Sequence, residues 1–213
     1  MSNKKATAKA TATATATADR AQSIAALFVT SATARMIDAE KCKTIVADIS
    51  AFSDSSFARQ IDATVSRGFL TFEQIEKIAN DLSITDKSHV DFIGLKVITK
   101  IRQALNALAN DRKSFFDGYT NSILSNLTRL QELTNKSALV SLSRSVEYSE
   151  TDQIADIKRA IDCSPSTAST QASSSRMMLR ALGVCNVAKR KNGDVITYAE
   201  NATANAVRVM YTV

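Results

Sequence analysis

The sequence of 213 residues predicts a mainly α-helical protein: a multi-helix N-terminal domain followed by a small α+β C-terminal domain. Five glycines and one proline leave few helix-breaking positions, and a 45% hydrophobic content is enough to build a packed core. Apolar residues recur every three or four positions through most of the chain, which is typical of amphipathic helices. Only the segment from Val184 onward alternates apolar and polar residues as strands do.

Residues 1–18 form a segment of low complexity, in which alanine alternates with threonine and three lysines stand close together. Such a segment buries little apolar surface, so we expect a disordered basic arm. It resembles the tails of histone-like proteins and the arms of some viral coat proteins. Lys4, Lys5 and Lys9 would then add electrostatic affinity for nucleic acid without sequence preference. The alternative is an inert tail that only raises solubility.

Residues 19–133 are expected to form a helical domain. Apolar spacing predicts helices over residues 19–36, 38–52, 54–67 and 71–82. Gly68 is well placed just past the end of the third helix, where a left-handed residue is common. Thr71 and Gln74 have the spacing of a capping box, which marks the start of the fourth.

The same domain is expected to hold one long helix over residues 87–113 and a second over 115–133. Each carries an apolar stripe at helical spacing, represented by Ile101 and Leu105 in the first and by Ile123 and Leu127 in the second. This spacing suits packing inside the domain, which we favour. It also suits homo-oligomerisation through the two helices.

The C-terminal domain, residues 134–213, is expected to contain two helices and a β-hairpin. We expect the first helix at Thr151–Ile161, a break at Pro165, a second helix from about residue 169 to Gly183, and the hairpin over 184–199. Asn192-Gly193 is a strong signal for the two-residue turn of a hairpin. Ala206–Val213 would add a third strand.

This order of elements resembles a winged helix-turn-helix domain. The matching residues are Leu179, Leu182 and Gly183 at the end of the second helix, the basic tip Lys189-Arg190-Lys191-Asn192-Gly193, and the aromatic Tyr198 on the returning strand. The resemblance implies that residues 169–176 enter the major groove while the hairpin tip grips phosphate or the minor groove. The implied nucleic-acid contacts are Thr170, Gln171, Ser173, Ser174, Arg176, Arg180, Lys189, Arg190, Lys191 and Asn192, joined by Lys4, Lys5 and Lys9 of the arm.

The excess positive charge of the chain, a net +6, lies at its two ends. Four basic residues against one acidic residue give residues 1–22 a net +3, and six against two give residues 164–213 a net +4. The stretch between them is close to neutral. Such segregation is typical of proteins that bind polyanions, although an ordinary solvated basic surface would show it as well.

Several classes of site have no support in the sequence. The glycines are scattered singly, so no loop that cradles phosphate is expected, and no nucleophile has a recognisable base partner. His89, Cys42, Cys163 and Cys185 lack the spacing of a zinc site. No apolar run is long enough to span a membrane. We therefore expect no metal, no cofactor, no enzymatic activity and a cytoplasmic protein, in a host cytoplasm or a virion.

The sequence thus favours a non-enzymatic protein that binds nucleic acid, DNA more than RNA, mainly through charge. Residues 56–78 are similar to a short element of phage-encoded proteins, which suggests a phage or viral setting. The alternative from another class is a virion or assembly protein, in which the helical middle of the chain would make the contacts between subunits.

Overall fold

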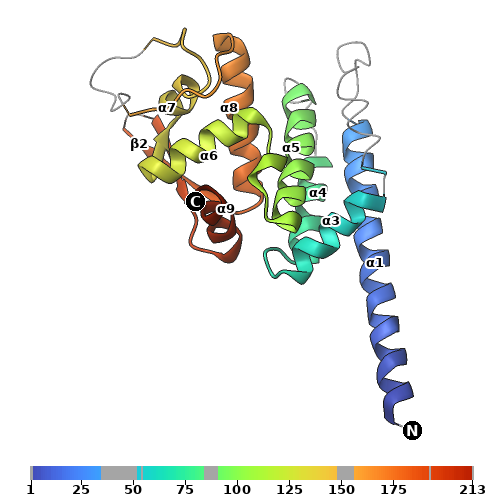
Figure 1. Cartoon of the computed structure of the whole chain (residues 1–213). Helices are drawn as coiled ribbons and strands as arrows, with labels where there is room; N and C mark the ends of the chain where they lie inside the picture. The colour runs from blue at the N-terminus through green and yellow to red at the C-terminus, as the bar shows by residue number, and fades with distance from the viewer. Residues whose placement is uncertain are drawn as a thin grey trace. The chain divides into compact units, whose positions relative to one another are not determined.

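The computed structural model describes residues 2–34, 52–53, 55–83, 91–147, 156–191 and 193–212. The chain divides into two compact units, Met1–Asp91 and Phe92–Val213. The first is helical, and the second combines helices with a small antiparallel sheet (Figure 1). The expected fold class, mainly α with a small α+β C-terminal region, is confirmed.

The first unit is built from α1 (Ser2–Ala34), α3 (Ser55–Ser66) and α4 (Phe72–Ser83). α1 packs against both of the other helices. Three aromatic side chains lie in its core: Phe57 packs edge-on against Phe28 and Phe52, with ring centroids 5.6 and 4.9 Å apart. The helix expected at 38–52 lies outside the described residues, except for Phe52.

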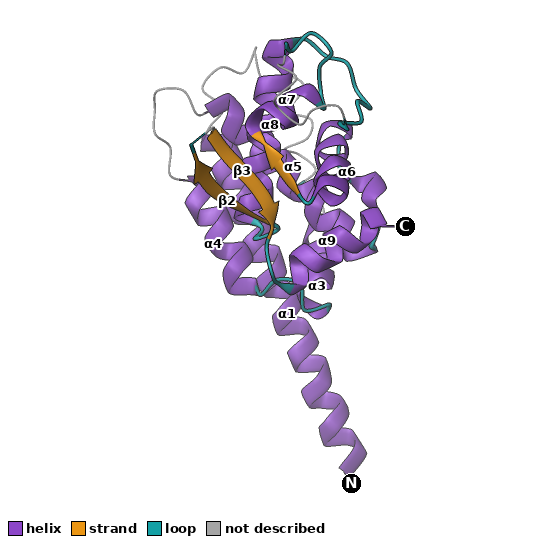
Figure 2. Cartoon of the chain, turned by 90° about the vertical axis from the view of Figure 1, so that its left-hand side faces the viewer, coloured by secondary structure: helices purple, strands orange, loops and turns teal. Residues whose placement is uncertain are grey.

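The segment expected to be a disordered arm is instead helical, because residues 2–18 form the first half of α1. Alanine has the highest helix propensity, and a threonine hydroxyl can remain within a helix by donating to a carbonyl of the preceding turn. Thr17 does so to the carbonyl of Ala14 at 2.9 Å. The second half of α1 buries Ile24 and Phe28. From this packed part the helix continues without a break toward the N-terminus (Figure 2).

The local signals between α3 and α4 are confirmed. Gly68 follows α3 with φ +73°, a conformation that residues with a side chain rarely adopt. The Thr71 amide donates to Gln74 Oε1 at 2.8 Å, while the Gln74 amide donates to Thr71 Oγ1 at 3.2 Å. This reciprocal pair is the capping box that the spacing predicted, and it fixes the start of α4.

The second unit runs from α5 to α9. Its elements are α5 (Asp91–Asn110), the short 3₁₀ helix η1 (Lys113–Phe115), α6 (Gly118–Leu130), β1 (Glu132–Thr134), α7 (Asn135–Val140), α8 (Pro165–Ala181), β2 (Cys185–Arg190), β3 (Gly193–Tyr198) and α9 (Ala202–Thr212). The three strands form one antiparallel sheet in the order β1-β3-β2 (Figure 2).

The long helix expected at 87–113 corresponds to α5, which ends at Asn110; residues 84–90 lie outside the described part. Asp111 follows it with a left-handed backbone, φ +56°, which stops the helix. The helix expected at 115–133 is α6, which is shorter at both ends. The apolar stripes of both helices are buried within the single chain, as the core-packing interpretation requires.

The boundary between units lies near residue 91 rather than at the expected 133/134. The expected boundary would cut β1, which pairs with β3 through Leu133 opposite Ile196. α6 also belongs with the sheet, since the Thr128 and Tyr198 hydroxyls share a hydrogen bond of 2.8 Å. A strand of three residues has too short a pattern to be detected, and this is why the sequence placed the boundary too late.

The helix expected at Thr151–Ile161 is not present in its described part, where residues 157–164 run without regular structure. The buried Asn126 of α6 holds this segment by pairing with the backbone of Lys158. Its amide nitrogen donates to the Lys158 carbonyl at 2.8 Å and its oxygen accepts the Lys158 amide at 2.9 Å. These two bonds replace those of a helix.

Two further expectations at the C-terminal end are corrected. α8 begins at Pro165 rather than near residue 169, because proline is well suited to the first position of a helix and Ser164 caps it. Residues 206–212, expected as a strand, belong to α9, whose Ala204, Val207 and Met210 form a buried helical stripe. The third strand of the sheet is β1.

Candidate nucleic-acid interface

α8 lies at the centre of the candidate interface and packs against α6, α7 and β2. Its inner face carries the buried side chains of Met178 and Leu179, followed by Leu182 just past its end. At its start, Ser164 Oγ accepts the Thr167 amide at 3.3 Å. α8 is therefore fixed along its whole length, and its other face remains toward solvent.

The solvent face of α8 is rich in hydroxyls and poor in charge. Ser166, Ser169, Met177 and Arg180 are exposed, while Ser173 and Arg176 are half-buried. Thr170 and Gln171 are also half-buried, and the Thr170 hydroxyl donates to the Ser166 carbonyl.

Ser174, expected among the nucleic-acid contacts, is fully buried, and its hydroxyl donates to the Gln171 carbonyl at 3.2 Å. Its side chain therefore does not reach solvent and cannot contact a ligand on the outer face of α8.

The hairpin β2–β3 distributes its cations over two faces. Lys189 lies opposite Asp194 and Arg190 opposite Gly193 in the register of the two strands. Because successive residues of a strand point to opposite faces, Lys189 and Asp194 share the face of Ile196, whereas Arg190 shares the other with Glu132. The cations of the tip, which the sequence treated as one group, are therefore not equivalent.

Arg190 forms a two-point ion pair with Glu132. The guanidinium nitrogens Nη1 and Nη2 lie 3.1 and 2.9 Å from Oε1 and Oε2 of the carboxylate. This geometry offers a defined orientation as well as charge neutralisation. Lys189 and Lys191, in contrast, are exposed, and neither has an ion pair with another described residue.

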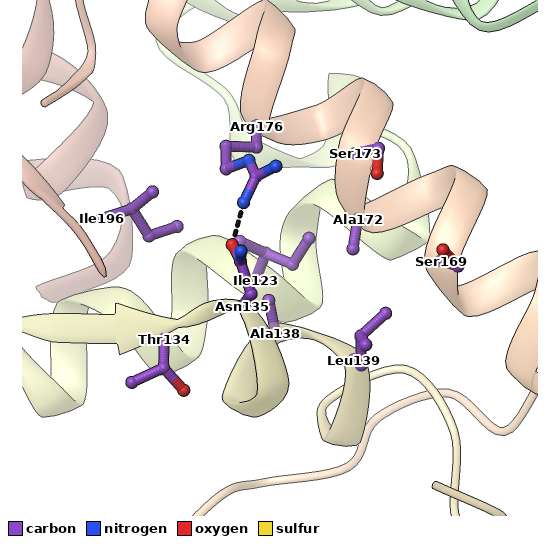
Figure 3. Close-up of a pocket in the computed structure, with 10 residues that line it drawn as sticks. All are labelled: Ile123, Thr134, Asn135, Ala138, Leu139, Ser169, Ala172, Ser173, Arg176 and Ile196. Atoms are coloured by element: carbon purple, nitrogen blue, oxygen red, sulfur yellow. Dashed lines mark hydrogen bonds between the residues drawn. The ribbon is translucent and has the colours of Figure 1, made fainter. Parts of the chain in front are cut away.

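Arg176 joins three elements of the unit. Its Nη1 donates to Oδ1 of Asn135, at the start of α7 (Figure 3). The same nitrogen lies 4.0 Å from Oδ2 of Asp194 on β3. Its side chain is 29% exposed. The sequence identified Arg176 as a contact residue but offered no signal for these partners, because they are brought together only by the fold.

Beside Arg176, the structure contains a pocket that sequence reasoning missed, here named the α7–α8 pocket. Its volume is about 170 Å³. Ile123, Ala172 and Ile196 supply apolar lining, and Asn135, Ser173 and Arg176 supply polar groups (Figure 3). These residues come from α6, α7, α8 and β3, so no local pattern could have revealed the pocket.

A buried polar cluster supports the inner side of α8. Lys100 Nζ lies 2.7 Å from Asp117 Oδ2, Asp117 accepts the Thr120 hydroxyl at 2.6 Å, and that hydroxyl shares a hydrogen bond of 2.9 Å with Ser175. Burial lowers the pKa of Lys100, and the Asp117 carboxylate opposes this effect. Burial would raise the pKa of Asp117, but the ammonium and the Thr120 hydrogen bonds hold it below its usual value. The cluster links α5, α6 and α8.

The remaining predicted contacts cannot be placed beside α8. Lys4, Lys5 and Lys9 belong to α1, in the other unit, and Asn192 lies outside the described residues. His89 and Cys42 also lie outside them. In the described ranges, no three His, Cys, Asp or Glu residues are grouped closely enough to bind a metal ion.

Comparison with known proteins yields no match, neither to a protein-family model, nor to a curated protein, nor to a solved structure. Of the helices described, none combines the length and the apolar character needed to cross a membrane.

Proposed function

We propose that the unit Phe92–Val213 binds nucleic acid, DNA in preference to RNA, through α8 and the β2–β3 hairpin, in the manner of a winged helix-turn-helix domain and without enzymatic activity. The observation that supports this proposal best is the succession of α7, α8 and a hairpin with a basic tip, packed as one unit. Two features depart from the family: residues 157–161, expected within the first helix of the pair, run without regular structure, and residues 141–164 separate α7 from α8, whereas a helix-turn-helix usually has a short turn.

The distribution of charge supports phosphate contact as the main source of affinity. Lys189 and Lys191 at the tip and Arg180 near the end of α8 are exposed, and no ion pair engages them among the described residues. Each cation that neutralises a phosphate releases a counterion, so binding should weaken steeply as salt rises. Three free cations support a modest affinity.

The face of α8 supports little discrimination between sequences. Arginine reads guanine best when its planar guanidinium is free for two parallel hydrogen bonds. Arg176, in the middle of α8, is half-buried, and its hydrogen bond to Asn135 directs the guanidinium toward α7 and Asp194 rather than toward a base in the major groove. The neighbouring serines can contact phosphate or sugar, which positions a protein on nucleic acid without reading its sequence.

The decisive measurement is fluorescence anisotropy with duplex DNA, single-stranded DNA and RNA of one sequence over a range of salt concentrations. The variant Lys189→Ala/Lys191→Ala should weaken binding to every sequence and reduce the slope of log affinity against log salt by about 2. The matched control is Arg112→Ala/Lys113→Ala, which removes the same charge between α5 and α6.

If both variants bind as the wild type does, the hairpin does not contact nucleic acid and the proposal fails. Equal losses in both variants would indicate a general effect of net charge. The alternative, a virion or assembly protein, would be favoured if light scattering found a large closed or filamentous assembly and none of the nucleic acids bound.

A further inference from the structure

We infer that the α7–α8 pocket is a binding site for a small organic monocarboxylate with an apolar body. The inference rests on the lining of the pocket, on its size and on the position of Arg176, and it does not depend on nucleic-acid binding.

The inner wall of the pocket is apolar and fixed. Ile123 and Ile196 come from buried positions on α6 and β3, and Ala172 comes from the inner side of α8. Ala138 and Leu139 of α7 extend this wall. Such a surface favours hydrocarbon, since burying apolar area removes it from water. The wall has no aromatic ring, so stacking does not contribute.

The volume of about 170 Å³ limits the size of the ligand. An engineered apolar cavity of about 150 Å³ in another protein accepts benzene, whereas pockets for drug-sized molecules start at about 300 Å³. The α7–α8 pocket therefore suits a body the size of one six-membered ring, and it is too small for a nucleotide or a peptide.

Arg176 provides the partner for a carboxylate at the polar side of the pocket (Figure 3). A guanidinium has five N–H donors, and the hydrogen bond to Asn135 engages one nitrogen of the group. Asp194, 4.0 Å away, is beyond hydrogen-bond distance. The side chain is thus held in place, yet it retains donors for a two-point contact with a carboxylate.

The neighbours of Arg176 favour a single negative charge on the ligand. The Asp194 carboxylate lies 4.0 Å from Nη1, the nitrogen that donates to Asn135, so its negative charge would repel a dianionic ligand more strongly than a monoanionic one. Ser173, about one turn before Arg176 on α8, lines the pocket and offers a further hydroxyl donor to the ligand.

The experiment uses the full chain and benzoate, the simplest aromatic monocarboxylate, followed by NMR chemical-shift titration. We expect saturable shifts of residues that line the pocket. Benzamide, the neutral molecule of the same shape, should bind at least about tenfold more weakly, because a hydrogen bond to a charged group contributes about one power of ten or more.

Three variants separate the pocket from the surface. Arg176→Gln should weaken benzoate about 10- to 100-fold and abolish the preference over benzamide. Ser173→Leu should fill the pocket and block both molecules, while Arg180→Gln, an exposed residue of the same helix, should change nothing. Arg176→Lys tests the role of the two-point contact independently and should retain the preference for the anion at lower affinity.

Circular dichroism establishes that each variant is folded before it is titrated. The inference is overturned if wild-type protein shows no saturable shifts up to about 10 mM benzoate, a concentration above which no useful site remains. It is also overturned if benzoate and benzamide bind equally, or if Ser173→Leu binds benzoate as the wild type does.

Discussion

The guanidinium of Arg190 pairs through two nitrogens with the carboxylate of Glu132, at 3.1 and 2.9 Å, and so joins the two outer strands of the sheet. The pair spans β3, since β1 and β2 are both neighbours of β3 and not of each other. Arg190 is therefore held on the hairpin by an acid from the other edge of the sheet. This contact has consequences for both binding and stability.

Replacing Glu132 by glutamine should raise affinity for nucleic acid while lowering stability slightly. The change frees Arg190 for phosphate, and we expect affinity to rise by about two- to fivefold at low ionic strength. The side chains are 55% and 44% exposed, so the loss of stability should stay below about 1 kcal/mol. Anisotropy and urea unfolding measure the two effects.

Glu200→Gln is the matched control, because it removes the same charge from an exposed position that has no ion pair among the described residues. An equal gain in affinity for both variants would show that net charge, rather than the release of Arg190, is responsible.

The sequence predicted best where the signal was local. The capping box of Thr71 and Gln74 is complete within four residues, and Asn192-Gly193 marks a hairpin whose strands then pair as expected. Among the residues of α8 expected to contact nucleic acid, Ser174 is the one whose side chain is fully buried. Serine is a residue type usually found at the surface, so its burial could not be predicted from the sequence.

Asp117→Asn should destabilise the second unit by about 3–5 kcal/mol, because it leaves the Lys100 ammonium buried without its counter-charge. The Lys100 side chain is 6% exposed, so water cannot replace the carboxylate. Lys100→Met/Asp117→Asn, which removes both charges, should recover much of this loss. Urea unfolding followed by circular dichroism measures the differences.

The exposed pair Lys77–Asp81 supplies the comparison, with an N–O distance of 2.8 Å that is nearly the same. Asp81→Asn should cost about 0.5 kcal/mol or less, since water solvates both partners. If the two aspartate substitutions prove equally mild, burial of the Lys100–Asp117 pair has no energetic importance.

The same pair predicts how stability changes in acid. The pKa of Asp117 is lower in the folded chain than its usual value, because Lys100 and Thr120 outweigh the effect of burial. The unfolded chain therefore takes up this proton first as pH falls below about 4, and the contribution of Asp117 to stability is lost as pH falls further through the folded-state pKa. It is fully present at neutral pH.

The free energy of unfolding, measured from pH 6 down to pH 2, should therefore fall less steeply for Asp117→Asn than for the wild type. The two proteins share every other carboxyl group, so the difference between the curves reports on Asp117 alone. Parallel curves would mean that Asp117 titrates normally in the folded protein.

Non-local contacts explain what the sequence could not provide. Apolar spacing at Thr151–Ile161 suited a helix, yet residues 157–164 run without regular structure, because Asn126, thirty-two positions earlier than Lys158, offers the backbone another partner. The α7–α8 pocket and the ion pair of Arg190 likewise depend on residues from distant elements. Neither the periodicity of apolar residues nor a short sequence motif can predict such pairings.

Asn126→Ala should release this segment from α6. The Asn126 side chain is buried; it donates to the carbonyls of Ser122 and Lys158 and accepts from the Lys158 amide. Alanine would leave both backbone groups of Lys158 without these partners, at a cost of about 1–3 kcal/mol. Amide hydrogen exchange at Lys158 should accelerate in the variant, while exchange within α8, whose Ser164 cap remains, should change little.

Asn110→Ala, at an exposed position bonded only within α5, is the control. Unchanged exchange at Lys158 would show that Asn126 does not hold the segment. Another contact would then have to anchor the chain before α8, and the hydrogen bond of 3.0 Å from the Cys163 amide to the Leu142 carbonyl is the candidate to test.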